Sequence, residues 1–305
     1  MNRILITGAL GQLGSALLKH YHDKGIFVLA TDIHECPKGL VYNYEKLDAL
    51  NFEGLLDVVK KYEINVIYHL AAILSAKGEK NPFHSWKINM DTFQNIVDVS
   101  LKCKIERVFW PSSIAVFGKD SNLEYVPQNS LMNPTTLYGV SKLAGEKLMN
   151  YYFEKYQLDI RSIRFPGIIS MDTKPGGGVT DYIIEMLNAS KKGNEYICFL
   201  DKNQRLPMIF MEDVISAITL LMSKKRSVLS ISSSYNIVGF TTTPEECLLA
   251  IKSNGINLKV HYKPDFRQKI ANTWPENVDD SLASKDWGWS PKFGLDKTVK
   301  IALNG

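Results

Sequence analysis

Tyr138 and Lys142 stand four residues apart in the stretch LYGVSKL (residues 137–143), which has the composition of a helix. Residues i and i+4 lie on one helical face, so both side chains can meet the same ligand. A free phenol has a pKa of about 10 and is a poor base at neutral pH. An ammonium group at ~4 Å, at an effective dielectric constant of about 20, favours the phenolate by roughly 4 kcal/mol. The pair therefore predicts a tyrosine acid/base whose pKa a neighbouring lysine lowers by up to about 3.

Two serine hydroxyls, on Ser112 and Ser113, end the β-type stretch RVFWPSS at residues 107–113. Parallel sheets bind ligands in the crevice at the carboxyl ends of their strands. One of these hydroxyls can hold a reacting oxygen while Tyr138 moves its proton. The three residue types together predict a site that interconverts an alcohol and a ketone. Taken alone, the Y-x-x-x-K spacing also fits a solvated helix face, and each serine also fits a structural strand end.

A glycine-rich loop, TGALGQLG, follows the β-type stretch at residues 3–7 and opens a helical one. Gly8 suits a tight turn, Gly11 lets the backbone approach a pyrophosphate, and Gly14 suits close packing of helix on strand. The helix N-terminus then offers N–H groups and the positive end of its dipole to phosphates. The position of this loop between strand and helix predicts a dinucleotide site.

Asp32 ends the second β-type stretch, about 20 residues beyond the glycines, where a carboxylate can accept both ribose hydroxyls. Its charge would repel a 2′-phosphate, so the sequence predicts NAD rather than NADP. The alternative is a turn or helix cap. Asp48, after a third short strand-like run, can bond the adenine amino group or cap the helix that begins near Asn51.

Apolar stretches of β type alternate with amphipathic helical stretches through the first half of the chain. The β-type stretches are residues 3–7, 27–32, 66–72, 107–113 and 159–167, and the helical ones are 14–25, 52–63, 84–103 and 136–156. This alternation predicts a parallel sheet covered by helices on both faces. The expected fold class is α/β, a Rossmann-like doubly wound parallel sheet with a smaller C-terminal substrate lobe.

The alternation loosens after Pro166, which suggests the domain division. We expect residues 1–166, together with about 205–237, to form an NAD-binding domain. Residues 167–204 and 238–305 are expected to form the substrate-binding lobe. The glycines and proline of KPGGGVTDY predict a loop there, and such a loop can close over a substrate.

Composition excludes several other classes of protein. The formal charge of +4 over 305 residues, without a basic stripe, argues against a nucleic-acid partner. No apolar stretch reaches membrane-spanning length, and no secretory or transit signal opens the chain. Four scattered cysteines indicate reduced, buried thiols in a cytoplasmic protein, and the histidines predict no metal site.

Several motifs resemble the extended short-chain dehydrogenase/reductase family across nearly the whole chain. They are TGALGQLG, HLAA (69–72), SSIAVFG (112–118) and YGVSK (138–142). The resemblance implies Tyr138 as catalytic acid/base with Lys142 and Ser113, and a homodimer. With the residues above, the predicted NAD site comprises Gln12, Leu13, Ile33, Ala49, Leu70, Ala71, Ala72, Asn89, Ser112, Phe165, Pro166 and Ile168.

Longer stretches in both halves are similar to the short-chain type of L-threonine 3-dehydrogenase. They include ILSAKGEK (73–80), RFPGIIS (164–170), PGGGVTDY (175–182) and ANTWPENVDDSLASKDWGW (271–289). This likeness implies NAD-dependent oxidation of the L-threonine Cβ hydroxyl to 2-amino-3-ketobutyrate. It implies substrate contacts at Ser75, Ser113, Tyr138, Gly178, Val179, Thr180, Asp181 and Trp274. Those enzymes usually carry threonine at the position of Val179, so the preferred hydroxy amino acid can differ here.

Two other functions remain open on the same fold. A nucleotide-sugar 4-epimerase uses the same tyrosine, lysine and NAD, but it needs a basic pocket, for which Arg205 is the one candidate. A non-catalytic NAD-binding scaffold would have no need of Tyr138, Lys142 and Ser113 together.

Overall fold

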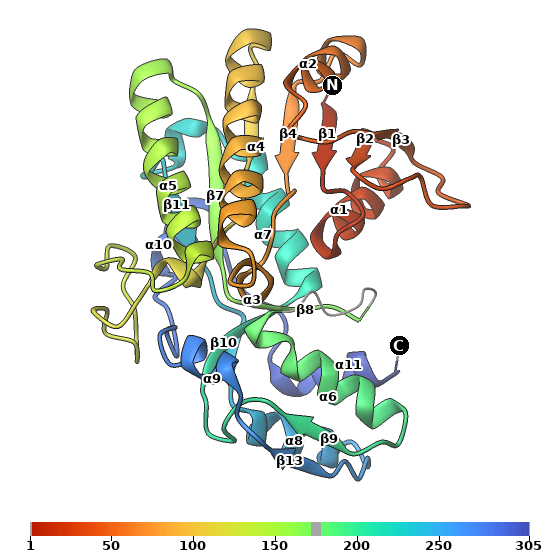
Figure 1. Ribbon diagram of the computed structural model, residues 1–305, viewed down its shortest axis with the longest axis vertical. Coiled ribbons are helices and arrows are strands. Elements are labelled where there is room, and N and C mark those ends of the chain that lie inside the picture. The colour runs from red at the N-terminus through yellow and green to blue at the C-terminus, as the bar shows by residue number, and fades with distance from the viewer. Residues whose placement is uncertain (1, 172–177, 305) are drawn as a thin grey trace.

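One large parallel sheet occupies the upper half of the molecule in Figure 1. The computed structural model describes residues 2–171 and 178–304. Within them the sheet runs β11-β7-β5-β4-β1-β2-β3, with β6 paired to β7, and its ladders are parallel. The strands are β1 (Arg3–Thr7), β2 (Phe27–Asp32), β3 (Asn43–Lys46), β4 (Val66–His69), β5 (Arg107–Phe109), β6 (Ser112–Ser113), β7 (Ile160–Phe165) and β11 (Ser234–Asn236). The predicted Rossmann-like α/β class is confirmed.

Helices cover both faces of this sheet because its strands are apolar on both sides. On β1, Ile4 and Ile6 join one core and Leu5 joins the other. The first core is completed by α1 (Gln12–Asp23), α7 (Met211–Ser223) and α10 (Ser281–Trp287). The second is completed by α2 (Phe52–Lys61), α4 (Pro82–Cys103) and α5 (Leu137–Tyr156).

Pro111 interrupts the strand that the sequence predicts over residues 107–113. The structure has β5 and β6 in its place, separated by Trp110 and Pro111. Proline cannot donate to a ladder, so pairing stops there and resumes with Ser112 opposite Arg164 and Ser113 opposite Phe165. The register against β7 is the same on both sides of the break, so the two serines end this strand path at the carboxyl edge of the sheet.

The first turn of α5 is fixed by two side chains. Thr136 is its N-cap, and the threonine hydroxyl accepts from Gly139 N at 3.1 Å. The Glu79 carboxylate accepts from Leu137 N at 2.8 Å and satisfies another free amide. Gly139 admits no side chain, because its Cβ would lie 2.1 Å from Ala115 O. Tyr138 is therefore held in a rigid turn.

The smaller lobe lies below the large sheet in Figure 1 and has its own core. Two small sheets cross it: β8 (Gly167–Ile169), β10 (Leu206–Phe210) and β12 (Phe240–Thr242) form one, and β9 (Tyr196–Cys198) pairs with β13 (Val260–Tyr262). Its longer helices are α6 (Tyr182–Lys191), α8 (Pro244–Ser253), α9 (Phe266–Ala271) and α11 (Leu295–Asn304). The remaining short elements of the chain are α3 (Ser75–Gly78), η1 (Ile114–Val116), η2 (Val179–Asp181) and η3 (Arg226–Val228).

Two segments lie apart from the domain predicted for them. The strand β10, within the 205–237 segment, pairs with β8 and β12 of the small sheet instead of the large one. The helix α10, predicted in the substrate lobe, buries Trp287 in the core of the large sheet, where its ring centroid lies 5.8 Å from that of Tyr235 on β11. We therefore propose that the NAD-binding domain resumes at Met211 and includes α10.

Two further observations concern the whole described chain. In residues 2–171 and 178–304, no helix combines the length and apolarity that crossing a bilayer requires. The four cysteines are free thiols, of which Cys198 and Cys247 are buried. Cys36 is exposed, so the prediction that all four thiols are buried is wrong for this loop residue.

Candidate active site

A cavity of about 250 Å³ opens at the carboxyl edge of the large sheet and reaches the smaller lobe. It brings together most of the residues that the sequence assigned to one site. They are Gly8, Gly11, Gln12, Leu13, Gly14, Leu70, Ala72, Ser75, Ser112, Ser113, Tyr138, Lys142, Phe165, Pro166, Ile168, Gly178, Val179, Thr180, Asp181 and Trp274. Residues from both halves of the chain thus line one space.

The glycine loop forms the end of the cavity at β1 and α1. Gly8 has φ of +65°, and a Cβ there would lie 2.7 Å from Ala71 N on the neighbouring strand end. A Cβ on Gly14 would lie 2.5 Å from Gly8 O, so α1 packs directly on the loop. Gly11 N–H turns back to Gly8 O at 3.1 Å. This cradle has the close packing and the helix N-terminus that a pyrophosphate requires.

Asp32 lies beside the same loop at the end of β2. Its Oδ2 accepts from Leu10 N at 3.1 Å, so the carboxylate and the glycine loop are tied together. Its Oδ1 accepts from His34 N at 3.2 Å and contacts His34 Nδ1 at 2.7 Å. His34, two residues beyond Asp32, was not predicted as a partner of this carboxylate, although its closeness in the sequence suggests the contact. Asp32 is therefore tied to the loop that is predicted to hold the pyrophosphate, and its contact with a ribose stays a prediction.

Tyr138, Lys142 and Ser113 meet at the middle of the cavity. Burial raises the pKa of Tyr138 to about 12, opposed by a hydrogen bond with Ser113. Burial also lowers the pKa of Lys142 to about 7, opposed by the charge of Glu146. The lysine Nζ donates to Pro111 O at 2.6 Å and lies 5.6 Å from the Tyr138 ring centroid.

The predicted lowering of the Tyr138 pKa is therefore wrong for the protein alone. The ammonium group was expected to act on the phenol as a full charge at ~4 Å. Burial penalises both charged forms instead, and it is the largest cause of the pKa shift of each group. Tyr138 is held as a neutral phenol, with its hydroxyl already bonded to Ser113.

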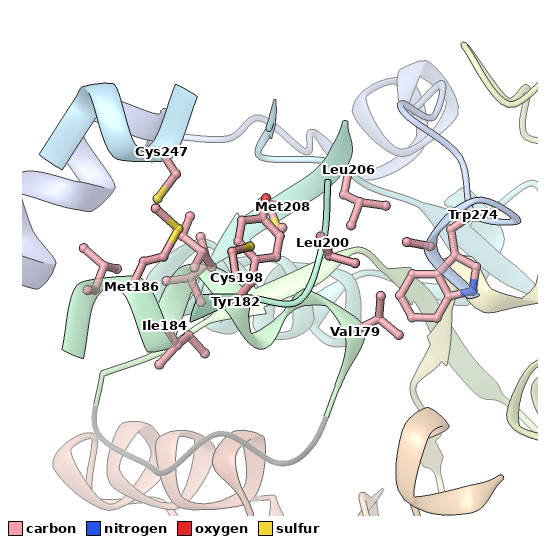
Figure 2. Close-up of a cluster of buried hydrophobic side chains, with 14 of the residues drawn as sticks. Val179, Tyr182, Ile184, Met186, Cys198, Leu200, Leu206, Met208, Cys247 and Trp274 are labelled. Carbon is pink, nitrogen blue, oxygen red and sulfur yellow. The ribbon is translucent and has the colours of Figure 1, made fainter. Parts of the chain in front are cut away.

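The smaller lobe supplies the far wall of the cavity. Figure 2 shows Val179 and Trp274 at one end of the lobe's hydrophobic cluster, with the Val179 side chain directed toward the indole ring. Val179 is fully buried and Trp274 is 6% exposed. Asp181 ends the short helix η2 that begins at Val179, and its Oδ2 accepts from Gly178 N at 2.8 Å. An apolar wall and a carboxylate therefore line the same cavity as Tyr138, Lys142 and Ser113.

The other glycines of the predicted loop, at positions 176 and 177, lie outside the described residues. So does Pro175, and the predicted closure of this loop over a substrate remains a prediction. Gly178 lies within the described part and lines the cavity.

Comparison with known proteins identifies the family. A family model described as the NAD-dependent epimerase/dehydratase family matches residues 4–237. The chain belongs to this family. An uncharacterised epimerase/dehydratase of Staphylococcus haemolyticus is 38% identical over 99% of this chain and 97% of its own length.

Solved structures resemble the chain equally closely. A GalE-like L-threonine dehydrogenase from Cupriavidus necator, in its holo form, is 40% identical with a TM-score of 0.97 over 99% of each chain. A monomeric L-threonine 3-dehydrogenase from a metagenome is 41% identical with a TM-score of 0.95, over 99% of this chain and 97% of the other. The resemblance to extended short-chain dehydrogenases is confirmed.

Membership in the epimerase/dehydratase family establishes NAD as the cofactor and the class of chemistry. The chain is an NAD-dependent oxidoreductase that acts on a CH–OH group. The glycine cradle and Asp32 fit this cofactor on steric and electrostatic grounds, because they leave backbone N–H groups for phosphates and a carboxylate for ribose hydroxyls.

Some residues of the predicted NAD site do not line the cavity. Asn89 is bonded to Ile73 N and O, at 2.8 and 3.1 Å, and so holds the loop after β4. Asp48 accepts from Leu50 N, while Asn51 caps α2, so Asp48 is not the helix cap. The other residues away from the cavity lining are Asp32, Ile33, Ala49 and Ala71.

A few cavity residues were missed by the sequence analysis: Leu74, Pro111, Ile114 and Gly167. Gly167 carried a detectable signal, since it directly follows Phe165 and Pro166 of the predicted site. Its Cβ would lie 2.6 Å from Thr180 Cβ, so glycine is required for β8 and η2 to meet. Pro111 acts through its carbonyl, which side-chain motifs do not reveal.

Replacing Asp32 with asparagine is expected to weaken NAD binding about 10- to 100-fold. Asp32 is predicted to accept hydrogen bonds from the ribose hydroxyls, and a hydrogen bond to a charged group contributes about 1.5–3 kcal/mol. Calorimetric titration of the purified protein with NAD measures the dissociation constant. Asp23→Asn, in an exposed carboxylate at the end of α1, is the matched control and should bind NAD normally. Equal affinity in the Asp32 variant and the wild type would refute this role.

Proposed function

We propose that this enzyme oxidises the Cβ hydroxyl of L-threonine to 2-amino-3-ketobutyrate, with Tyr138 as the acid/base. The observation that carries this proposal is the shared cavity. It is lined by Tyr138 and Ser113 from the large domain, and by Asp181, Val179 and Trp274 from the smaller lobe. The two solved L-threonine dehydrogenases of similar sequence and shape support the same reading.

The chain's own residues account for the proton movements. When bound, NAD accepts the hydride from the substrate Cβ. The Ser113 hydroxyl hydrogen-bonds the substrate oxygen, and the Tyr138 hydroxyl relays the proton that leaves that oxygen. Lys142, in its charged form, stabilises negative charge as it develops on the phenol. One hydride and one proton leave the alcohol, which gives the ketone, NADH and a proton.

The far wall suits a small amino acid. A zwitterion needs an acceptor for its ammonium group, and we assign this role to the carboxylate of Asp181. The hydroxyls of Ser75 and Thr180 line the same space and can bond the substrate carboxylate. Val179 and Trp274 offer an apolar surface to the substrate methyl group.

A nucleotide-sugar substrate fits the cavity less well. Among the described lining residues, Lys142 is the one basic side chain, and it is bonded to Pro111 O. Arg205, the candidate for a diphosphate, does not line the cavity in the described part of the chain. Both of its Nη atoms are bonded to Glu246, and this pair also caps α8 through Thr243. A diphosphate would have to break this ion pair.

The purified enzyme, mixed with NAD, is expected to produce NADH on addition of L-threonine, followed by its absorbance. L-serine, L-allo-threonine and a UDP-sugar are tested in parallel. Turnover of L-threonine with no reaction of the UDP-sugar supports the proposal. Silence with all three amino acids, together with epimerised UDP-sugar, would establish the epimerase instead. Preference for another hydroxy amino acid that reverts to L-threonine in Val179→Thr would identify Val179 as the specificity residue.

The proposal includes a cytoplasmic homodimer, as the family resemblance implies. Tyr151 and Tyr156 on α5 are each 47% exposed and present aromatic surface that a second subunit could cover.

A further inference from the structure

Glu146 lies one further turn along the face of α5 that carries Tyr138 and Lys142. The three side chains have the spacing i, i+4, i+8, so they form one row on the helix. Glu146 is 1% exposed, and a carboxylate buried so deeply almost always has a polar partner. The mechanism proposed above does not use it.

A dense hydrogen-bond network surrounds this carboxylate. Ser112 Oγ donates to Glu146 Oε1 at 2.6 Å. Arg164 on β7 donates through Nε to Oε1 at 3.0 Å and through Nη2 to Oε2 at 2.8 Å, which makes the pair bidentate. Arg164 is itself 3% exposed, and its Nη1 reaches Gln128 O and Asn236 Oδ1. The network joins α5 to β6, β7 and β11.

The strand end that carries Ser113 is fastened to α5 at three successive residues. Pro111 O accepts from Lys142, Ser112 donates to Glu146, and Ser113 bonds Tyr138. Glu146 therefore fixes the middle of the segment whose neighbours contact the catalytic pair.

We propose that Glu146 is a positioning residue that locks residues 111–113 against α5 and places a negative charge one helical turn from the Lys142 side chain. This rests on the catalytic role proposed for Lys142. Glu146 does not line the cavity formed by the described residues, and its two oxygens accept from Ser112, Arg164 and Ser233. Its action on the reaction passes through Lys142 and Ser113.

His69 and Tyr138, the neighbours of Lys142 with shifted pKa values, do not change charge near neutral pH. Burial, together with the charge of Lys142, lowers the pKa of His69 on β4 to about 3, so His69 stays neutral. Tyr138 has a pKa of about 12 and stays a phenol. The Arg164 guanidinium forms an ion pair with Glu146, with Nη2 2.8 Å from Oε2. Lys142, with its pKa of about 7, is therefore the group that titrates there.

Removing the negative charge of Glu146 is expected to lower the pKa of Lys142. The negative charge of Glu146 raises the pKa of Lys142 against the opposing effect of burial. In Glu146→Gln this support is lost and Arg164 is left unpaired, so both changes favour the neutral amine. Lys142 would then lose its proton at a lower pH. Activity that needs the ammonium group would therefore begin to fall at a lower pH as the pH is raised.

The fluorescence of Trp110 should report the charge of Lys142 in the absence of substrate and NAD, because Lys142 Nζ lies 4.2 Å from the Trp110 ring centroid. Tryptophan fluorescence is followed from pH 5 to pH 9 in the wild type, in Glu146→Gln and in Trp110→Phe, which identifies the Trp110 component. Glu154→Gln, an exposed carboxylate on the same helix, is the matched control.

The Trp110 fluorescence of the wild type is expected to change with a midpoint near pH 7. In Glu146→Gln this midpoint should lie lower by about one pH unit or more. The control keeps the wild-type midpoint, and Glu146→Asp, which retains the charge, restores most of it. The same displacement should appear in the pH profile of kcat/KM. An unchanged midpoint, or a profile lowered by one constant factor at every pH, would overturn the proposal.

Two further measurements keep the outcome clear. If Glu146→Gln fails to fold, the double variant Glu146→Gln/Arg164→Met removes the unpaired cation, and its midpoint should still lie below that of the wild type. If the wild type shows no turnover with any substrate but the midpoint moves as expected, the proposed function fails and the control of Lys142 by Glu146 stands.

Discussion

Replacing Tyr138 with phenylalanine is expected to lower kcat by about 10³-fold, the typical contribution of a positioned acid/base. The ring remains, and it packs against the core of the smaller lobe, so the fold should be retained. Only the hydroxyl bonded to Ser113 is lost. NADH formation at saturating L-threonine measures the change, and calorimetry of NAD binding should give an unchanged dissociation constant.

Tyr156→Phe is the matched control for this substitution. It lies on the same helix, and its ring is 47% exposed and far along α5 from the cavity lining. The control should keep full activity. A Tyr138→Phe enzyme that retains more than about a tenth of wild-type kcat would mean that another group moves the proton, since general acid/base catalysis contributes at least about 10².

Replacing Gly8 with alanine is expected to destabilise the protein by about 2–5 kcal/mol, the sum of left-handed backbone strain and overpacking. The residue has φ of +65°, and the added Cβ would lie 2.7 Å from Ala71 N and 2.8 Å from Ala71 Cα. These are backbone atoms, so the loop has to move away from the end of β4. Because the same loop cradles the pyrophosphate, NAD affinity should fall about 10- to 100-fold with the loss of one charged hydrogen bond.

Gly25→Ala separates the two causes. Gly25 has nearly the same φ, +67°, but nothing lies within 4 Å of its added Cβ. It should lose only about 1–2 kcal/mol from backbone strain and bind NAD normally. Denaturant unfolding and NAD titration of both variants measure these effects. Equal losses of stability and affinity in the two variants would show that close contact with Ala71 has no importance.

The strands and helices of the NAD-binding half were predictable because each depends on a local pattern. Apolar runs gave β1, β2 and β4 close to their observed bounds, and amphipathic periods gave α4 and α5. The smaller lobe was harder. Its strands β8, β10 and β12 are short, and they pair with partners far along the chain. The helix α6, which follows the loop, was not predicted at all.

The sequence by itself indicated the cofactor and the class of reaction. A glycine loop between strand and helix, a carboxylate at the end of the next strand, and a tyrosine four residues before a lysine each act through fixed local geometry. These features need no distant partner to be recognised. They correctly indicated NAD and oxidation of a CH–OH group, which the family confirms.

Only the tertiary structure decided the electrostatics of the site. Burial depends on packing between α5, β6, β7 and the smaller lobe, so the raised pKa of Tyr138 and the lowered pKa of Lys142 could not be read from spacing. The pairing of Glu146 with Arg164 and Ser112 likewise joins three elements that are separate in sequence. Charge and burial act through space, and a local pattern does not record what the fold places beside it.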